Sequence, residues 1–239
     1  MSLDFEELDF QQTPLGDLIL RRRRMRSLDN LEIYEVILGT GYLMSSLFTT
    51  VEIALADLGL SKLKEPKLDV VVGGLGLGYT AQAALKDERV ESLLVVDALP
   101  EVISWHERGL VPLGEELTQD PRCRFIHGDF FVLSASDGFD PEHADRRFHA
   151  ILLDIDHSPQ NLIHEQHGHF YTTEGLRTLA TRLHPGGVFA MWSDDPPDEE
   201  FMTKLRGVFP RTESQIVTFP NPLQNRESRS TVYLAQLAS

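Results

Sequence analysis

The sequence predicts an α/β fold in which helices cover both faces of a mostly parallel sheet. Beyond residue 67, short apolar runs alternate with segments of helical periodicity. The runs are continuously apolar, as is typical of strands buried on both faces, and a glycine-rich turn at residues 73–78 follows the first of them. These three observations indicate an open sheet whose ligands bind beyond the carboxyl ends of its strands.

The start of the chain predicts a small β-rich extension followed by one helix. Its expected elements are a hairpin at residues 8–20, a second strand pair at 32–38 and 42–44, and a helix at 47–60. Residues 14–17 and 39–41 supply the two turns. The polar segment 62–67 indicates a boundary, so we expect an N-terminal region at 1–62 and a Rossmann-like domain at 63–239.

The Rossmann-like domain is expected to contain seven strands. The first five strands are expected at 68–72, 93–97, 123–127, 148–154 and 188–192. Helices are expected between some of them, at 79–85, 100–110 and 173–183. Two further strands, 214–219 and 231–237, close the sheet.

Composition and charge narrow the possible functions. Hydrophobic residues make up 41% of the chain and charged residues 25%, which is ordinary for a globular protein. The single cysteine, Cys123, rules out an intramolecular disulfide and a cysteine-based zinc cluster. With 37 Asp and Glu against 22 Lys and Arg, the net charge is −15. We therefore expect no nucleic-acid partner, and a cationic or neutral small substrate is favoured.

Three segments bear on location and partners. Residues 1–7 are acidic and lack the features of a signal peptide, and the apolar stretch 36–60 contains Glu52 and Asp57, which a membrane span would have to bury. We expect a cytoplasmic protein that does not enter the membrane. The basic run Arg21 to Arg26 has two interpretations, an anion-binding patch or an exposed strand whose solvated charges protect a sheet edge, and the second is favoured.

The glycine-rich turn and the next two strand ends predict a nucleoside site. Gly73, Gly74, Gly76 and Gly78 permit a tight turn and close approach of a ligand, but Tyr79 stands where the dinucleotide pattern needs its last glycine, which argues against NAD. Asp97 ends the next strand, where a carboxylate can accept hydrogen bonds from ribose hydroxyls. The third strand is followed by Gly128, Asp129 and Phe130. Asp129 offers a carboxylate to a purine, and Phe130 offers an aromatic ring. An ordinary turn and a helix cap are the alternative roles for the glycines and for Asp129.

The order of these motifs resembles the class I methyltransferase fold and, within it, the spermidine synthases and related aminopropyltransferases. The resemblance spans nearly the whole chain and rests on the motifs at 14–16, 73–78, 95–97, 127–129, 151–159, 170–171 and 183–188 and on the helix that contains Glu52. It implies a transferase that binds S-adenosylmethionine or its decarboxylated form, and a homodimer that pairs through the N-terminal strands.

The resemblance also implies roles for individual residues. Asp97 matches the acidic ribose ligand, Asp129 the adenine contact and Asp154 the catalytic acid or base, while Asp156 and Tyr171 are further catalytic candidates. In the family, an Asp-x-x-Asp-Pro motif comes after the fourth strand, whereas here the sequence is Asp154-Ile155-Asp156-His157-Ser158-Pro159. Two other positions depart from the family, since Gly76 replaces an acidic residue and the Tyr-His-Glu signature is reduced to Thr50-Val51-Glu52.

These departures decide between donors. The decarboxylated donor ends in an ammonium that needs a nearby carboxylate, and Gly76 supplies none, so methyl or related transfer from S-adenosylmethionine to a small cationic amine is favoured. Spermidine synthesis from putrescine and nucleoside binding without catalysis are the alternatives. A helix cap is the alternative role for Asp154, and a solvated loop position is the alternative for Asp156.

The remaining polar residues near these motifs have less specific interpretations. The segment that carries His157, His164, His167 and His169 invites a metal site, but an exposed lid over the amine is the favoured interpretation, and no metal is expected. Asp194 and Asp195 are expected to cap a helix that begins near Pro196, or to line the cleft.

Overall fold

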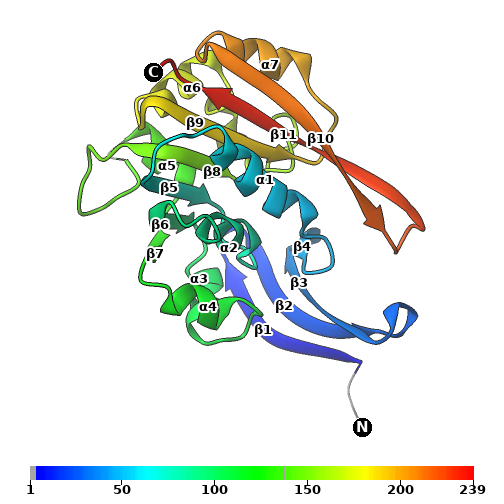
Figure 1. The fold of residues 1–239 in the computed structure, drawn as a ribbon. Helices are drawn as coiled ribbons and strands as arrows, with labels where there is room; N and C mark the ends of the chain where they lie inside the picture. Colours follow the sequence, from blue (N-terminus) through cyan, green and yellow to red (C-terminus); the bar gives the residue numbers. More distant parts are fainter. Residues whose placement is uncertain (1–3, 137) are drawn as a thin grey trace.

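The computed structural model describes residues 4–136 and 138–239, which form two sheets (Figure 1). Residues 1–3 of the acidic N-terminus and residue 137 lie outside the described residues. The smaller sheet is antiparallel, with its strands in sequence order: β1 (Phe5–Thr13), β2 (Gly16–Met25), β3 (Leu31–Leu38) and β4 (Gly41–Ser45). Both predicted strand pairs are thereby confirmed.

The larger sheet has seven strands in the order β10-β11-β9-β8-β5-β6-β7. Its strands are β5 (Leu68–Gly73), β6 (Val90–Asp97), β7 (Cys123–His127), β8 (Phe148–Leu153), β9 (Leu183–Ser193), β10 (Arg211–Asn221) and β11 (Arg226–Gln236). Five strands run parallel, and the β10–β11 hairpin joins β9 in antiparallel fashion. The predicted mostly parallel, seven-stranded sheet is confirmed.

Helices cover both faces of the larger sheet (Figure 1). On one face lie α1 (Thr50–Ser61), α2 (Tyr79–Leu85), α3 (Pro100–Glu107) and α4 (Gly114–Gln119), and on the other lie α5 (Phe130–Ala135), α6 (Thr173–Ala180) and α7 (Glu199–Arg206). Short 3-10 turns add Arg26–Leu28 and Glu165–His169. The six-residue helices α4 and α5 are too short to show helical periodicity, which is why the sequence did not predict them.

The continuous apolar runs result from burial on both faces. On β5, Val70 and Val72 pack under α1 and α2, whereas Val71 belongs to the core on the opposite face. On β8, Ala150 and Leu152 pack against the first core in the same way. Because successive side chains of a strand point to opposite faces, a strand with two covered faces needs apolar residues at every position.

Two sequence predictions are wrong at particular residues. The predicted helix 173–183 extends too far, because Leu183 pairs with Phe148 as the first residue of β9. The basic run does not protect a sheet edge, because β2 lies between β1 and β3. Its arginines are instead ion-paired: Arg21 and Arg23 contact the buried carboxylate of Glu35 at 2.6 and 2.8 Å.

The helix α1 packs on the larger sheet, against α2 and β9, although it precedes the polar segment at which the sequence predicted a boundary. The division of the chain at residue 62 therefore stays a prediction. Within the described ranges, none of the helices combines the length and apolarity that crossing a membrane requires.

Candidate functional site

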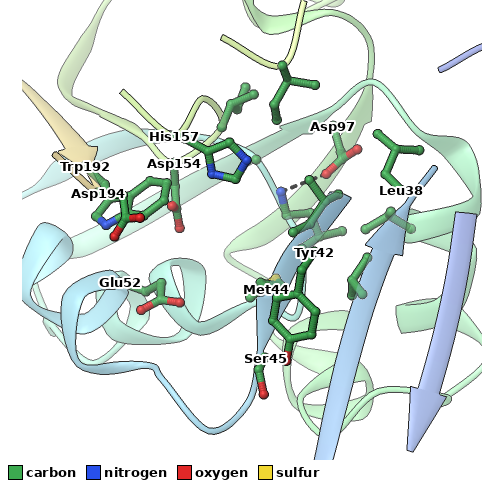
Figure 2. A pocket seen from close by; sticks show the side chains of 18 of the residues that line it. Leu38, Tyr42, Met44, Ser45, Glu52, Asp97, Asp154, His157, Trp192 and Asp194 are labelled. Atoms are coloured by element: carbon green, nitrogen blue, oxygen red, sulfur yellow. Dashed lines mark hydrogen bonds between the residues drawn. The ribbon is translucent and has the colours of Figure 1, made fainter. Parts of the chain in front are cut away.

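The carboxyl ends of the parallel strands open into a cavity of about 1430 Å³. The smaller sheet closes one side of it with β4, and α1 and the β10–β11 hairpin close others (Figures 1 and 2). Pockets for single small ligands commonly measure roughly 300–1,000 Å³, so this space is large enough for two small molecules together.

The glycine-rich turn forms the floor of the cavity and lies against other segments too closely for side chains. Gly74 has a φ of +95°, and a Cβ there would overlap the backbone oxygen of Asp154. Gly76 has a φ of +46°, and a Cβ there would overlap the thioether of Met44. Both positions therefore favour glycine for conformation, and Gly74 also for space, because its neighbour is backbone. Gly73 and Gly78 lie behind the cavity wall and pack against Phe130 and Leu117.

Asp97 holds the turn from the end of β6. Its Oδ2 accepts the N–H of Leu75 at 2.9 Å, as Figure 2 shows, and its Oδ1 accepts the N–H of Leu99 at 2.8 Å. Burial raises the pKa of Asp97, and these N–H donors oppose that shift. The carboxylate faces the cavity while its position is fixed by the backbone of two neighbouring segments.

The third strand end contributes a helix cap as well as cavity surface. Oδ1 of Asp129 accepts the N–H groups of Phe131 and Val132 at 2.8 and 3.2 Å, so Asp129 is the N-cap of α5 and also lines the cavity. Phe130 reaches the cavity wall but is 1% exposed and stacks on Phe139 at a centroid distance of 4.9 Å. Gly128 supports this arrangement from outside the lining, and its N–H donates to the carbonyl of Asp97.

Asp154 and Glu52 form a pair of carboxyl groups on the cavity wall. Asp154 comes directly after β8, Glu52 lies on α1, and both side chains are labelled in Figure 2. Burial raises the pKa of Asp154, and the hydroxyl of Thr80, which donates to its Oδ2 at 2.6 Å, opposes this rise. Burial and repulsion from Asp154 raise the pKa of Glu52. Two desolvated carboxyl groups of this kind bind protons more readily than exposed ones, and they attract a cation.

Asp156 and Tyr171 lie outside the cavity lining. Asp156 is 3% exposed and accepts three hydrogen bonds, from the N–H of Ile163 at 2.7 Å, His167 Nδ1 at 2.9 Å and the Tyr171 hydroxyl at 2.8 Å. Burial and repulsion from Asp156 raise the pKa of Tyr171 well above its usual value, so this hydroxyl stays protonated and donates. The side chains of Asp156, His167 and Tyr171 thus anchor the segment that comes after β8.

That anchored segment presents histidines to the cavity. His157, His164 and His167 line it, and the ring of His167 stacks on Phe131 at a centroid distance of 3.9 Å. Across the described part of the chain, sets of three side chains close enough to hold a metal ion occur elsewhere, at Asp69, His149 and His184 and at Asp140, Glu142 and His143.

Several cavity residues were not assigned from the sequence. Met44 and the hairpin residues Phe219 and Ser230 belong to distant segments, and no local pattern marks them. Trp192 and Asp194 lie at or just after the end of β9 and line the cavity, which agrees with the alternative, cleft-lining role expected for Asp194, whereas Asp195 is not part of the lining. The predicted capping role of Asp194 and Asp195 is wrong: α7 begins at Glu199, and the side chain of Asp198 caps it by accepting the N–H of Glu200.

Comparison with known proteins gives matches of fold and none of sequence. The chain matches no known protein family by sequence and no curated relative. It resembles spermidine synthase from Thermotoga maritima with a TM-score of 0.73 and 17% identity, over 96% of this chain and 72% of that one. A spermidine synthase in complex with the transition-state analogue AdoDATO matches with a TM-score of 0.71 and 18% identity, over 96% and 72% of the two chains. The chain has a spermidine synthase-like fold.

Human methyltransferase-like protein 13, solved in complex with SAH, also matches, with a TM-score of 0.57 and 18% identity over 79% of this chain and 82% of that one. The expected class I methyltransferase fold, with a β-rich N-terminal extension, is therefore confirmed. At these identities the likeness extends to the fold and not to the reaction.

Proposed function

We propose that this spermidine synthase-like protein is a transferase that binds S-adenosylmethionine and transfers its methyl group, or a related group, to a small cationic amine. Support for the donor comes from the cavity beyond the strand ends, where Asp97 is available to ribose hydroxyls and Asp129 to the exocyclic amine of adenine. The neighbours crystallised with AdoDATO and SAH hold related nucleosides in the same fold.

The observation that carries the proposal is the pair formed by Glu52 and Asp154. Both carboxyl groups are desolvated, Asp154 raises the affinity of Glu52 for a proton, and in the described part of the chain neither is engaged in an ion pair with Lys or Arg. A bound ammonium group would relieve this repulsion. The aromatic side chains of Trp192 and Phe48 line the same cavity and suit an amine with an apolar body.

The reaction needs an amine that has lost a proton, and we assign the removal of the proton, the positioning of the base and the stabilisation of charge to different residues. The sulfonium supplies the carbon that the amine nitrogen attacks, so a C–N bond forms as the C–S bond breaks and its electron pair stays on sulfur. Asp154 accepts the proton that the nitrogen loses, because its raised pKa suits a general base. The hydrogen bond from Thr80 fixes the orientation of the Asp154 carboxyl group. The carboxyl group of Glu52 stabilises the positive charge that remains on the amine substrate.

Aminopropyl transfer from the decarboxylated donor to putrescine is the second candidate, favoured by the likeness to spermidine synthases over 96% of the chain. Gly76 argues against aminopropyl transfer, because this position offers no acidic side chain to the terminal ammonium of the decarboxylated donor. A third candidate is a nucleoside-binding protein without catalysis.

Calorimetric titration of S-adenosylmethionine and of its decarboxylated form into the same nucleoside-free preparation separates the first two candidates. We expect tighter binding of the carboxylated donor, followed by methyl transfer in a screen of amines. Preference for the decarboxylated donor by more than about tenfold, or ordinary spermidine synthase kinetics with putrescine, would overturn the methyl-transfer proposal. Donor binding without any turnover would favour the third candidate.

The proposal extends to assembly and location. We propose a homodimer that pairs through the N-terminal strands and a cytoplasmic location, without nucleic-acid or membrane partners. The acidic net charge of −15 supports the absence of a nucleic-acid partner.

A further inference from the structure

Met44 reaches from β4 of the smaller sheet to the glycine-rich turn that follows β5 of the larger sheet, as Figure 2 shows. Its Sδ accepts the N–H of Leu77 at 3.1 Å. The same sulfur occupies the space beside Gly76, because a Cβ on that residue would overlap it. The side chain of Met44 therefore fills the space inside the turn and accepts a hydrogen bond from the backbone N–H of Leu77.

The partner of Leu77 differs from those of the neighbouring N–H groups. The N–H of Gly74 donates to the carbonyl of Val96 at 2.9 Å, that of Leu75 to Asp97 at 2.9 Å, and that of Gly78 to the carbonyl of Leu75 at 2.7 Å. The N–H of Gly76 also faces Asp97. Among these described donors, the one on Leu77 is bound to a thioether, which is a weak acceptor on a flexible, unbranched side chain. A carboxylate from a ligand is a stronger acceptor and can replace it.

We propose that the thioether of Met44 occupies the position of the donor's carboxylate and lowers the affinity for S-adenosylmethionine, because the carboxylate has to displace it. The inference rests on the proposed function, in which the donor lies against this turn. On binding, the carboxylate of S-adenosylmethionine takes the N–H of Leu77, and the side chain of Met44 rotates away. The decarboxylated donor has no group that can accept this hydrogen bond, so it does not displace the thioether and forfeits the contact.

The test compares three ligands that differ in their tails. S-adenosylmethionine has the full tail, its decarboxylated form lacks the carboxylate, and 5′-methylthioadenosine lacks the whole tail and, as a thioether, also the sulfonium charge. Calorimetric titrations are made with the wild type, with Met44→Ala and with Met25→Ala. Met25 is a matched control, because it is a partly buried methionine of the same sheet that lies outside the cavity lining.

Removing the thioether should remove the cost of displacing it. We expect Met44→Ala to bind S-adenosylmethionine about fivefold tighter, the worth of one ordinary hydrogen bond, while its affinity for the other two ligands changes less than twofold. Met25→Ala should leave all three affinities as in the wild type. Equal changes for all three ligands, or no gain with the carboxylated donor, would show that Met44 only packs.

A second measurement does not depend on the stability of the alanine variant. The five methionines of the chain give separate signals when their methyl groups carry ¹³C, and Met44→Leu identifies the signal of Met44. This signal should shift when S-adenosylmethionine is added and stay in place with 5′-methylthioadenosine. A signal that fails to move with the carboxylated donor contradicts the inference, whereas failure of the wild type to bind 5′-methylthioadenosine contradicts the proposed function itself.

Discussion

The hydroxyl of Thr80 gives a direct test of the state of Asp154. It donates to Oδ2 at 2.6 Å, and Thr80 is 3% exposed, so Thr80→Val removes the donor while the shape of the side chain is kept. A hydrogen bond to a charged group is worth roughly 1.5–3 kcal/mol, and one pKa unit corresponds to about 1.36 kcal/mol. We therefore expect the pKa of Asp154, already raised by burial, to rise by about one to two further units.

The assay is a ¹³C NMR titration of the side-chain carboxyl groups, in which Asp154→Asn identifies the signal of Asp154. Thr80→Ser is the control, because it keeps the hydroxyl and should titrate like the wild type. A Thr80→Val protein whose Asp154 titrates as in the wild type would refute the reasoning. So would an equal shift in Thr80→Ser, because the shift could not then be attributed to the hydrogen bond.

Thr80→Val should also alter the pH dependence of stability. Because the pKa of Asp154 is higher in the folded than in the unfolded chain, the folded state binds more protons, and the free energy of unfolding falls as pH rises from the unfolded pKa to the folded one. In Thr80→Val that interval is wider. The variant should therefore lose more stability than the wild type between about pH 4 and neutral pH, as measured by urea unfolding.

Three further predictions concern the same wall of the cavity. Asp154→Asn should lower turnover by at least about a hundredfold and leave nucleoside affinity within about twofold, and a variant with unchanged turnover would remove Asp154 from the mechanism. The same Asp154→Asn variant should lower the pKa of Glu52, because it removes a repelling charge, and an unchanged pKa would show that the two groups do not interact. Gly74→Ala should destabilise the fold by more than about 2 kcal/mol, since its Cβ meets the backbone of Asp154. Gly39→Ala, also at a positive φ but with no atom within 4 Å of the added Cβ, should cost only about 1–2 kcal/mol in calorimetry, and equal losses would contradict the steric argument.

Much of the fold was accessible from the sequence because burial leaves a periodic pattern. The helix at 79–85 and the strand at 123–127 were predicted with the bounds that the structure shows. Elements whose pattern is too short were not predicted, as with α4 and α5. The burial of Glu35 was also inaccessible, because it depends on Arg21 and Arg23 of the neighbouring strand.

Some residues of the candidate site could likewise be predicted from the sequence, and others could not. Position at a strand end selected Asp97 and Asp129, because the carboxyl ends of parallel strands meet at one edge of a sheet, and the family resemblance selected Asp154, which lines the same cavity. Asp156 also lies just beyond a strand end, yet its side chain turns away from the cavity to bind His167 and Tyr171. Spacing along the chain does not specify the direction of a side chain in an irregular segment.

The sequence by itself determined the class of fold, the floor of the cavity and the row of carboxylates along it, because these depend on periodic burial and on the residues at the carboxyl end of each strand. Only the tertiary structure decided which groups act together. Asp154 acts on the charge of Glu52, Thr80 donates to Asp154, and Met44 accepts the N–H of Leu77. Each of these contacts joins different segments of the chain, and each depends on the packing of α1, α2 and the smaller sheet around the strand ends, which no local pattern encodes.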